Sequence, residues 1–536
     1  MLDLLITDAR VLDGTGDAAF AADVGVAEGR VVLVRRLAEG RSGEAGGLAG
    51  GGRPADGPPA ARVVPAAGRV LAPGFIDVHT HSDLAPFTDP SMDSALRQGC
   101  TTVVVGNCGG CAWPRRALPD LATTLGVSAD DLDGWDSAAQ YLDAVDAARP
   151  ACNVAALTGF GSLRTAVMGH ERRPAAPGEI DRMRGLLAEA LQAGALGMST
   201  GLIYVPDMYA STAEIAAVTA AMAPYDGIYT THLRAEGKLL FDAVREALAI
   251  GRLAGVHAHI SHLKLEGRFA WGRADELLRL VLGGGATGDQ YPYTAWETDL
   301  ASFLPPWAPV GDLAKLTADP STRARLVTAI EEGEEGWESS IAGAGWELIV
   351  LEDDVEGLSG RTIADAAAER DQTPVDFTLD LLQRHPAAAC SGHTMREEDV
   401  RAILAHPDVM VGSDGMAVSP EGPLAGTLLH PRSHGTFPRV LGRYVRDERL
   451  LTLAAAVHKM TGLPAQVFGL SGRGRVAEGA AADLVLFDPA AVADTATFTA
   501  PHAYPQGIDL VVVNGVVAWD GARRERAGRA LRRAPR

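Results

Sequence analysis

The segment Gly74-Phe-Ile-Asp-Val-His-Thr-His81 decides the fold, because it reads as a short apolar strand that ends in two histidines. Side chains at positions i and i+2 of a strand point to the same face. We therefore expect the imidazoles of His79 and His81 to lie side by side, and such a pair is half of a metal site. The alternative interpretation is a pair of polar residues at a strand end that only make hydrogen bonds.

Similar short apolar segments recur through the middle of the chain and alternate with helical patterns such as Ile180–Ala193 and Phe241–Ala254. This alternation predicts an α/β fold, a closed (β/α)8 TIM-like barrel with catalytic residues at the C-terminal ends of its strands. The predicted barrel strands are Phe75–His79, Thr101–Val105, Asn153–Leu157, Leu196–Ser199, Gly227–Thr231, His257–Ser261, Thr287–Tyr291 and Met410–Gly412. Ala388–Ser391 has the same character, so the sequence leaves open which eight candidates close the barrel.

Both ends of the chain are rich in strand patterns, and we expect them to form one small β-sandwich domain together. The expected boundaries are residues 1–72 for the N-terminal part of this domain, 73–470 for the barrel, and 471–536 for the C-terminal part with a frayed basic tail. Residues 38–60 are expected to be a flexible Gly-rich loop, and about 296–345 an insertion near the barrel mouth.

The composition limits the possible partners. Hydrophobic residues make up 47% of the 536 and charged residues 22%, which favours a large core. The formal net charge of −20 argues against nucleic acid, so any bound anion must meet a local group of Lys or Arg. Five cysteines are too few for a disulfide framework. Without a signal-like N-terminus or a run of about 20 apolar residues, we expect a cytoplasmic protein that is not in a membrane.

Cys108 ends the run Thr101-Thr-Val-Val-Val-Gly-Asn-Cys108, and a thiolate is a strong zinc ligand. With Cys111 it forms a CxxC pair, which also allows a redox site or an inert buried cysteine. A zinc ribbon would need a second cysteine pair, and the sequence has none. The position of Cys108 directly at a strand end favours it over Cys111 as a ligand.

Three further side chains, His232, His262 and Asp414, follow other apolar strands. One such residue is more often a hydrogen-bonded structural group than a ligand. Six at the strand ends of one barrel are unlikely to be accidental, because the fold brings those ends to one pocket. His257 and His259 precede His262 in its strand, and we assign them structural roles.

The order of an HxH pair, two separate histidines and a late aspartate resembles the amidohydrolase superfamily. The sequence Gly-Asn-Cys-Gly109, where a bridging lysine is common, is similar to the D-aminoacylase (N-acyl-D-amino-acid deacylase) branch. Further matching stretches are Gly197-Met-Ser-Thr-Gly-Leu-Ile-Tyr204, Ile260-Ser-His-Leu-Lys264, Asp289-Gln-Tyr-Pro-Tyr293, Gly412-Ser-Asp-Gly415, His430-Pro-Arg-Ser-His-Gly435 and Ala481-Ala-Asp-Leu-Val-Leu-Phe-Asp488.

The resemblance implies zinc-dependent hydrolysis of N-acyl-D-amino acids to a carboxylate and a D-amino acid, with Asp414 as the general base. It implies a tight zinc at Cys108, His232 and His262. It also implies a weaker metal position at His79, His81, Asp414 and the bridging Cys108. The residues that match substrate-binding positions of the family are Lys264, Tyr291 and Arg432, which grip the carboxylate, and Tyr204, which lines the pocket.

The chain departs from the family pattern at one place. Tyr291-Pro-Tyr-Thr is followed by Ala295-Trp-Glu297, where the family commonly has Ala-Gly-Ser, so the preferred side chain stays open. Three alternatives are a dihydropyrimidinase-like ring opener, a barrel that has lost its catalytic function, and a cysteine redox protein. A ring opener would carry a carboxylated lysine as bridge, and a scaffold would have lost ligands. The oligomeric state is not given by the sequence.

Overall fold

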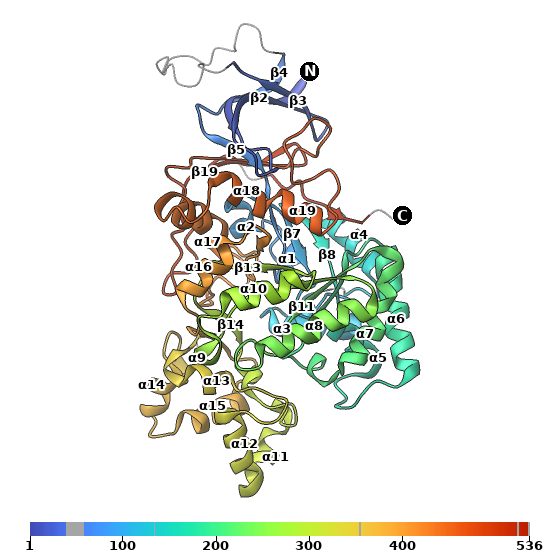
Figure 1. Ribbon diagram of the computed structural model, residues 1–536, viewed down its shortest axis with the longest axis vertical. Helices are drawn as coiled ribbons and strands as arrows, with labels where there is room; N and C mark the ends of the chain where they lie inside the picture. The colour runs from blue at the N-terminus through green and yellow to red at the C-terminus, as the bar shows by residue number, and fades with distance from the viewer. Residues whose placement is uncertain (39–57, 133, 353–354, 523–524, 534–536) are drawn as a thin grey trace.

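The computed structural model describes residues 1–38, 58–132, 134–352, 355–522 and 525–533. Figure 1 shows three regions along its long axis: a small β region beside the N-terminus, a central barrel, and a helical lobe at the far end. The expected Gly-rich loop at 38–60 falls on the undescribed residues 39–57 except at its edges. In the described part of the chain, no helix has both the length and the apolar character needed to span a bilayer.

The central region is an eight-stranded parallel barrel, and each expected strand occurs with its ends within two residues of the prediction. Its strands are β6 Phe75–Asp77, β7 Cys100–Val105, β8 Asn153–Ala156 with its continuation β9 Thr158–Gly159, β10 Gly197–Gly201, β11 Ile228–His232, β12 His257–Ile260, β13 Thr287–Gln290 and β17 Val409–Val411. The barrel closes just beyond the ends of β6 and β17. There the Asp414 amide donates to the His79 carbonyl at 2.8 Å, and the His81 amide to the Gly415 carbonyl at 2.9 Å.

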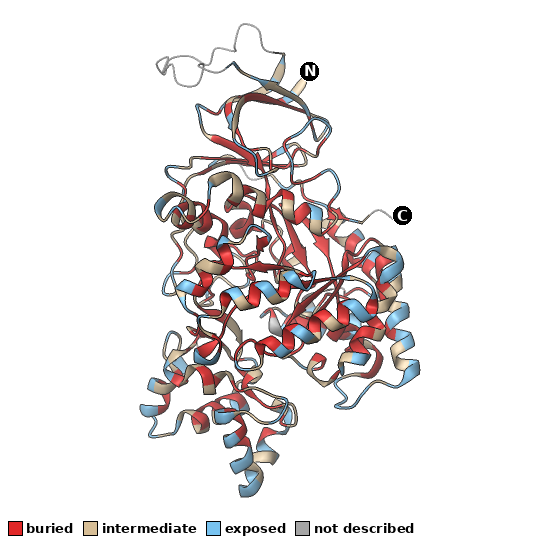
Figure 2. Ribbon diagram, in the orientation of Figure 1, coloured by how far each residue is buried: buried red, intermediate tan, exposed pale blue. Residues whose placement is uncertain are grey.

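Helices surround the barrel, and Figure 2 shows them buried toward the strands and exposed on the outside. In α8 the buried residues Leu240, Val244, Ala247 and Gly251 recur at the three- and four-residue spacing that puts them on one face. The helices between and after the strands are α1 Ala85–Thr88, α2 Asp93–Arg97, α3 Leu118–Thr124, α4 Ala138–Ala148, α5 Phe160–Met168, α6 Pro177–Gln192, α7 Thr212–Thr219, α8 Leu240–Ala254, α9 Gly267–Ala270, α10 Ala274–Gly283, α16 Glu397–Ala405, α17 Arg432–Arg439, α18 Leu453–Met460 and α19 Gly462–Val467.

The surplus strand candidate lies outside the barrel. It is β16 Ala389–Gly392, which pairs antiparallel with β14 Trp296–Asp299 on one side and β15 Ile349–Leu351 on the other. These strands belong to the lobe, which therefore runs well past the expected end at residue 345 because β15 and β16 complete its sheet. The lobe helices are α11 Leu313–Ala318, α12 Pro320–Glu332, α13 Ser340–Ala344, α14 Ile363–Ala368 and α15 Pro374–Arg384.

Both ends of the chain contribute to one eight-stranded sheet at the top of Figure 1. Its strands are β1 Leu2–Val11, β2 Phe20–Ala27, β3 Arg30–Arg36, β4 Ala60–Pro65, β5 Val70–Pro73, β18 Leu484–Phe487, β19 Ile508–Val513 and β20 Val516–Trp519. Alternate residues of β18 enter two cores: Leu484 and Leu486 pack in the core of this sheet, while Val485 and Phe487 pack in the barrel core beside Phe75. The sheet is thus fixed to the barrel by side chains of a strand that is buried on both faces.

The C-terminal segment differs from the expected frayed tail over the described residues 525–533. Strand β21, Ala530–Leu531, pairs parallel with β8 of the barrel. Arg532 forms ion pairs with Asp146 at 2.6 Å and Asp143 at 2.7 Å, both on α4. Backbone pairing and neutralised charge together hold this part of the basic segment against the barrel rather than in the small sheet.

Phe487→Ala tests the connection between the small sheet and the barrel. The Phe487 ring is fully buried, with its centroid 6.3 Å from that of Phe75, so truncation leaves a cavity between the two regions. We expect a loss of about 3–5 kcal/mol in the free energy of unfolding, measured by chemical denaturation. Phe269→Ala, at a side chain that is 41% exposed, is the control and should cost well under about 1 kcal/mol. Equal costs for the two variants would contradict the packing described here.

Candidate active site

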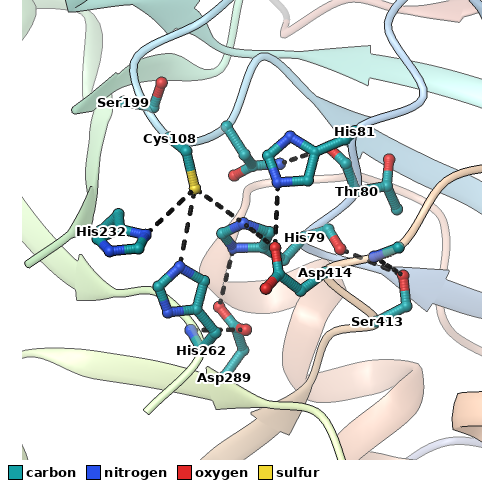
Figure 3. A network of polar contacts seen from close by, with 12 residues as sticks. His79, Thr80, His81, Cys108, Ser199, His232, His262, Asp289, Ser413 and Asp414 are labelled. Carbon is teal, nitrogen blue, oxygen red and sulfur yellow. Dashed lines mark hydrogen bonds and ion pairs between the residues drawn. The ribbon is translucent and has the colours of Figure 1, made fainter. Parts of the chain in front are cut away.

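The candidate residues from the strand ends meet around the sulfur of Cys108 (Figure 3). Cys108 Sγ lies 3.4 Å from His79 Nε2, 3.9 Å from His232 Nδ1 and 3.7 Å from His262 Nε2. His79 and Cys108 follow β6 and β7, His232 ends β11, and His262 follows β12. The closed barrel therefore brings together residues as far apart in the sequence as His79 and His262, which are 183 positions apart. The convergence expected from the sequence is present in the structure.

The second group lies on the other side of the sulfur. His81 Nε2 is 3.0 Å and His79 Nε2 is 3.3 Å from Asp414 Oδ1. The potential ligand atoms of His79, His81, Cys108 and Asp414 form one group within 4.8 Å, and those of Cys108, His232 and His262 form another. Cys108 is the member that both groups share.

The geometry around the sulfur fits a tetrahedral zinc ion. With sulfur at about 2.3 Å and nitrogen at about 2.0–2.1 Å from the metal, a tetrahedral angle separates the two ligand atoms by about 3.6 Å. Within the group of Cys108, His232 and His262, the Sγ–nitrogen separations of 3.9 Å and 3.7 Å lie close to this value. A thiolate and neutral imidazoles are also the donors that zinc favours.

Three of the converging residues have an unusual backbone conformation. The φ angles are 50° at Cys108, 38° at His262 and 53° at Asp414, in the left-handed region that residues other than glycine rarely adopt. Each such residue costs on the order of 1–3 kcal/mol and persists only where its surroundings fix it. One such surrounding contact is at Gly201, where an added Cβ would lie 2.1 Å from the Cys108 carbonyl oxygen. The chain therefore turns sharply at these positions and directs their side chains into the site.

Glu236 is a buried contact residue that the sequence interpretation missed. Its Oε1 accepts a hydrogen bond from Lys264 Nζ at 2.7 Å and lies 3.2 Å from His262 Nδ1. Its Oε2 lies 3.6 Å from His232 Nε2. The Glu236 carboxylate thus faces His232 and His262 at the ring nitrogens that point away from Cys108. Metal-binding histidines commonly have a carboxylate partner at this outer nitrogen. Its position four residues after His232 was the available signal.

Asp289 of β13 is a second buried carboxylate that supports the site. Its carboxylate bonds to His259 Nε2 at 2.7 Å and accepts from the His262 amide at 3.0 Å. The structural role assigned to His259 agrees with this contact. Asp77 accepts from the Ser413 amide at 2.9 Å, so it ties β6 to the segment that carries Asp414.

The charges of the site stabilise one another. Burial alone would raise the pKa of Cys108, but His79, His232 and His262 hold it well below the usual thiol value. Burial likewise opposes the charge of Asp414, but the guanidinium of Arg432, 2.7 Å away, and the nearby histidines hold its pKa well below the usual range. The surrounding cationic groups therefore favour the deprotonated form of both side chains, which is the form that binds a metal.

The predicted carboxylate-binding residues lie at the site, but they already have acidic partners. Lys264 pairs with Glu236, and Arg432 pairs with Asp414 and lies 3.4 Å from Glu297 Oε2. Both cations line the cavity described below. Tyr291 is only 2% exposed and, among the described residues, is not part of the cavity wall.

A cavity of about 880 Å³ opens in front of the converging residues. His81, Cys108, His232 and Asp414 lie in its wall. The predicted pocket residue Tyr204 lines it too, and its hydroxyl lies 3.0 Å from Thr298 Oγ1 of β14. Strands of the lobe form another part of the wall through Glu297, Thr298, Asp299 and Glu352. The lobe therefore completes a pocket of the size that a small molecule needs.

Cys111 is separate from this arrangement. Its thiol is fully buried and donates to the Trp113 carbonyl at 2.8 Å. Burial raises its pKa to about 12, so it is a poor source of thiolate. These features disfavour a redox pair of Cys108 and Cys111.

Comparison with known proteins gives consistent similarities along the whole chain. The model of the Amidohydrolase family matches residues 62–518. D-aminoacylase from Alcaligenes xylosoxydans xylosoxydans is 37% identical over 538 residues, which cover 99% of this chain and 98% of that protein. A D-aminoacylase structure, described for a binuclear metal centre with one-metal activation and second-metal attenuation, has a TM-score of 0.80 at 36% identity and covers 99% of this chain and 100% of its own. N-acyl-D-glutamate deacylase from Bordetella bronchiseptica, solved with zinc and a phosphonate mimic of the tetrahedral intermediate, has a TM-score of 0.79 at 34% identity over 99% of both chains.

Cys108→Ser tests whether the shared sulfur holds a metal. We expect the purified variant to bind zinc more weakly than the unaltered protein by at least about a hundredfold, because loss of a direct ligand should exceed the 10–100-fold cost of losing an outer partner. Zinc affinity is measured by competition with a chromogenic chelator. Cys111→Ser is the matched control and should keep its zinc; equal losses in the two variants would refute the assignment.

Proposed function

The chain belongs to the amidohydrolase family, and from this we propose that it hydrolyses the amide bond of N-acyl-D-amino acids, giving a carboxylate and a free D-amino acid. The observation that carries the proposal is Cys108 Sγ, placed between two groups of potential zinc ligands at the mouth of the barrel. The relatives with 34–37% identity, a D-aminoacylase and an N-acyl-D-glutamate deacylase, support the reaction class.

We assign a tight zinc position to Cys108, His232 and His262. A second, weaker position uses His79, His81 and Asp414, with Cys108 as the bridge between the two. Zinc bound there would supply a water of lowered pKa as nucleophile and would polarise the amide carbonyl. Glu236 faces the outer ring nitrogens of His232 and His262, and Lys264 Nζ lies 2.7 Å from His262 Nδ1. We propose that these two charged groups support the histidines from behind while their other nitrogens face the zinc position.

Asp414 is the proposed general base and acid. Its carboxylate is anionic and lines the cavity, so it can accept the proton of the attacking water and deliver it to the leaving amine. Arg432 holds Asp414 Oδ2 at 2.7 Å, which leaves Oδ1 toward His79 and His81. The base is thereby fixed in one orientation before substrate enters.

Lys264 and Arg432 are the proposed binding groups for the substrate carboxylate. Both side chains line the cavity, and Arg432 Nε is buried without a hydrogen-bond partner among the described residues. Tyr291 lies behind both cations, with its ring 5.8 Å from Lys264 Nζ and 5.1 Å from the Arg432 guanidinium carbon. We therefore propose that Tyr291 positions these cations and that Tyr204 contacts the substrate at the pocket wall.

The small sheet is proposed to be the sandwich domain expected from the sequence. β1 pairs with β4 through its first half and with β5 through its second half, and its pairing with β2 has an irregularity between Ile6 and Ala9. Such a bend allows one sheet to fold over its own core.

A substrate screen tests the reaction class. We expect amine release from N-acetyl-D-amino acids at least about a hundredfold faster than from their L-enantiomers, with zinc measured on the same sample. Cyclic amides such as dihydrouracil and hydantoin form the control set and should be poor substrates. Turnover of L-substrates or cyclic amides alone, or a fully active protein without metal, would contradict the proposal.

Asp414→Asn tests the assigned base. The amide cannot accept the proton, so we expect kcat to fall by about 10²–10⁴-fold while the tight zinc stays bound. Asp181→Asn, at an exposed position on α6, is the matched control and should retain full activity. Retained turnover in Asp414→Asn would show that another group is the base.

A further inference from the structure

We propose that Glu297 and Glu352 of the lobe form a subsite for a positively charged side chain, so that the preferred substrates are N-acyl derivatives of D-lysine and D-arginine. This inference rests on the proposed deacylation and names its substrate class.

Side chains alternate between the two faces of the lobe sheet, and this alternation determines which of them face the subsite. Glu297 of β14 pairs with Ser391 of β16, and the next pair along the strands is Thr298 with Cys390. Residues two apart on a strand, and residues paired across strands, share a face. Cys390 and its partner Leu351 are buried in the lobe core. The carboxylates of Glu297 and Asp299 therefore lie on the opposite face, although Thr298 of the edge strand β14 also reaches the cavity.

The pairing of β15 with β16 places Glu352 on the same face as Glu297. Glu352 directly follows Leu351, the partner of Cys390, and its amide donates to the Ala389 carbonyl. Ala389 lies two residues from Ser391 and is itself paired with Asp299. Glu297, Asp299, Ala389 and Glu352 all lie in the cavity wall. One face of the lobe sheet thus presents acidic side chains to the pocket.

Acidic side chains outnumber basic ones at this part of the cavity wall, where Glu297, Asp299 and Glu352 lie near Arg432. Among the described residues, Glu297 has an ion pair with Arg432 at 3.4 Å, but the same guanidinium holds Asp414 at 2.7 Å. Glu352 is only 3% exposed, and its Oε2 has no hydrogen-bond partner in the described chain. Burial and the neighbouring Glu297 raise the pKa of Glu352 well above its usual value. The raised pKa means that Glu352 keeps its proton more readily while the pocket is empty, where its hydrogen-bond partners are Glu297 and Ser391. A cation bound beside Oε2 would favour loss of that proton and would stabilise the negative charge of both carboxylates.

The placement of Arg432 connects this subsite to the reaction centre. Arg432 contacts the proposed base Asp414 and also Glu297, so it lies between the two. A substrate whose α-carboxylate binds Arg432 has its side chain within reach of the lobe sheet. A lysine ammonium on its flexible four-carbon stem, or a guanidinium, can then approach Glu297 and Glu352. A carboxylate side chain would meet like charges there, which disfavours acidic substrates.

The unaltered, zinc-loaded enzyme provides the first test. We expect kcat/KM for Nα-acetyl-D-lysine to exceed that for Nα-acetyl-D-norleucine, which has the same stem without the ammonium group, by about tenfold or more. Nα-acetyl-D-glutamate should be the poorest of the three. An equal or higher value for the norleucine or glutamate derivative would overturn the subsite. Failure to hydrolyse any of the three would instead refute the proposed deacylation.

Substitution identifies the residues responsible. Glu297→Gln and Glu352→Gln keep the shape but cannot become negatively charged beside a bound cation, and each should reduce the lysine-to-norleucine ratio of kcat/KM by about tenfold. Glu347→Gln is the matched control, since Glu347 is an exposed acid of the same lobe outside the cavity wall, and its ratio should not change. An unchanged ratio in both cavity variants, or an equal decrease in the control, would overturn the assignment. Because the readout is a ratio measured on one preparation, partial loss of folded protein does not affect it.

Discussion

The contact of one sulfur atom with imidazoles from three other strands is the interaction on which the site depends. Cys108 Sγ reaches His79 on one side and His232 and His262 on the other, so both groups of potential ligands are defined by its position. That position requires a left-handed turn at Cys108 and a glycine at 201, where no side chain could fit against the Cys108 carbonyl. The barrel supplies these conditions because its parallel strands all end at the same mouth.

Buried acids organise the rest of the site. Glu236 holds Lys264 and faces two histidines, while Asp414 holds Arg432. An acidic protein with a net charge of −20 thereby keeps two cations at the wall of its cavity, each fixed by a carboxylate. Charges that are already fixed in this way need little reorganisation when a charged substrate binds, which is the general benefit of a preorganised site. The lobe adds further acids at one wall and so gives the cavity an electrostatic asymmetry.

The sequence predicts the barrel well because strand and helix patterns alternate along this part of the chain. The six candidate metal ligands lie at the ends of those strands or within four residues after them. It could not place Ala389–Gly392, because a strand of a lobe sheet and a strand of a barrel have the same local pattern. The end of the lobe was missed for the same reason, since its last strand, Ala389–Gly392, pairs with Trp296–Asp299 across a long sequence distance.

Long-range contacts also explain the other differences. Glu236 lies in a loop and becomes important only when the fold brings His262 and Lys264 beside it. The basic segment near Arg532 is held by acids on α4, of which Asp143 lies 389 residues earlier in the chain. Tyr291 follows its strand as expected, but packing places it behind the cations instead of in the cavity wall.

The central claim is that Cys108 and two histidines hold the tight metal. Zinc K-edge X-ray absorption on protein loaded with one equivalent of zinc tests it directly. We predict one sulfur scatterer at about 2.3 Å together with nitrogen scatterers at about 2.0–2.1 Å, two of them from histidine. A first coordination sphere of nitrogen and oxygen alone, with no sulfur, would contradict it.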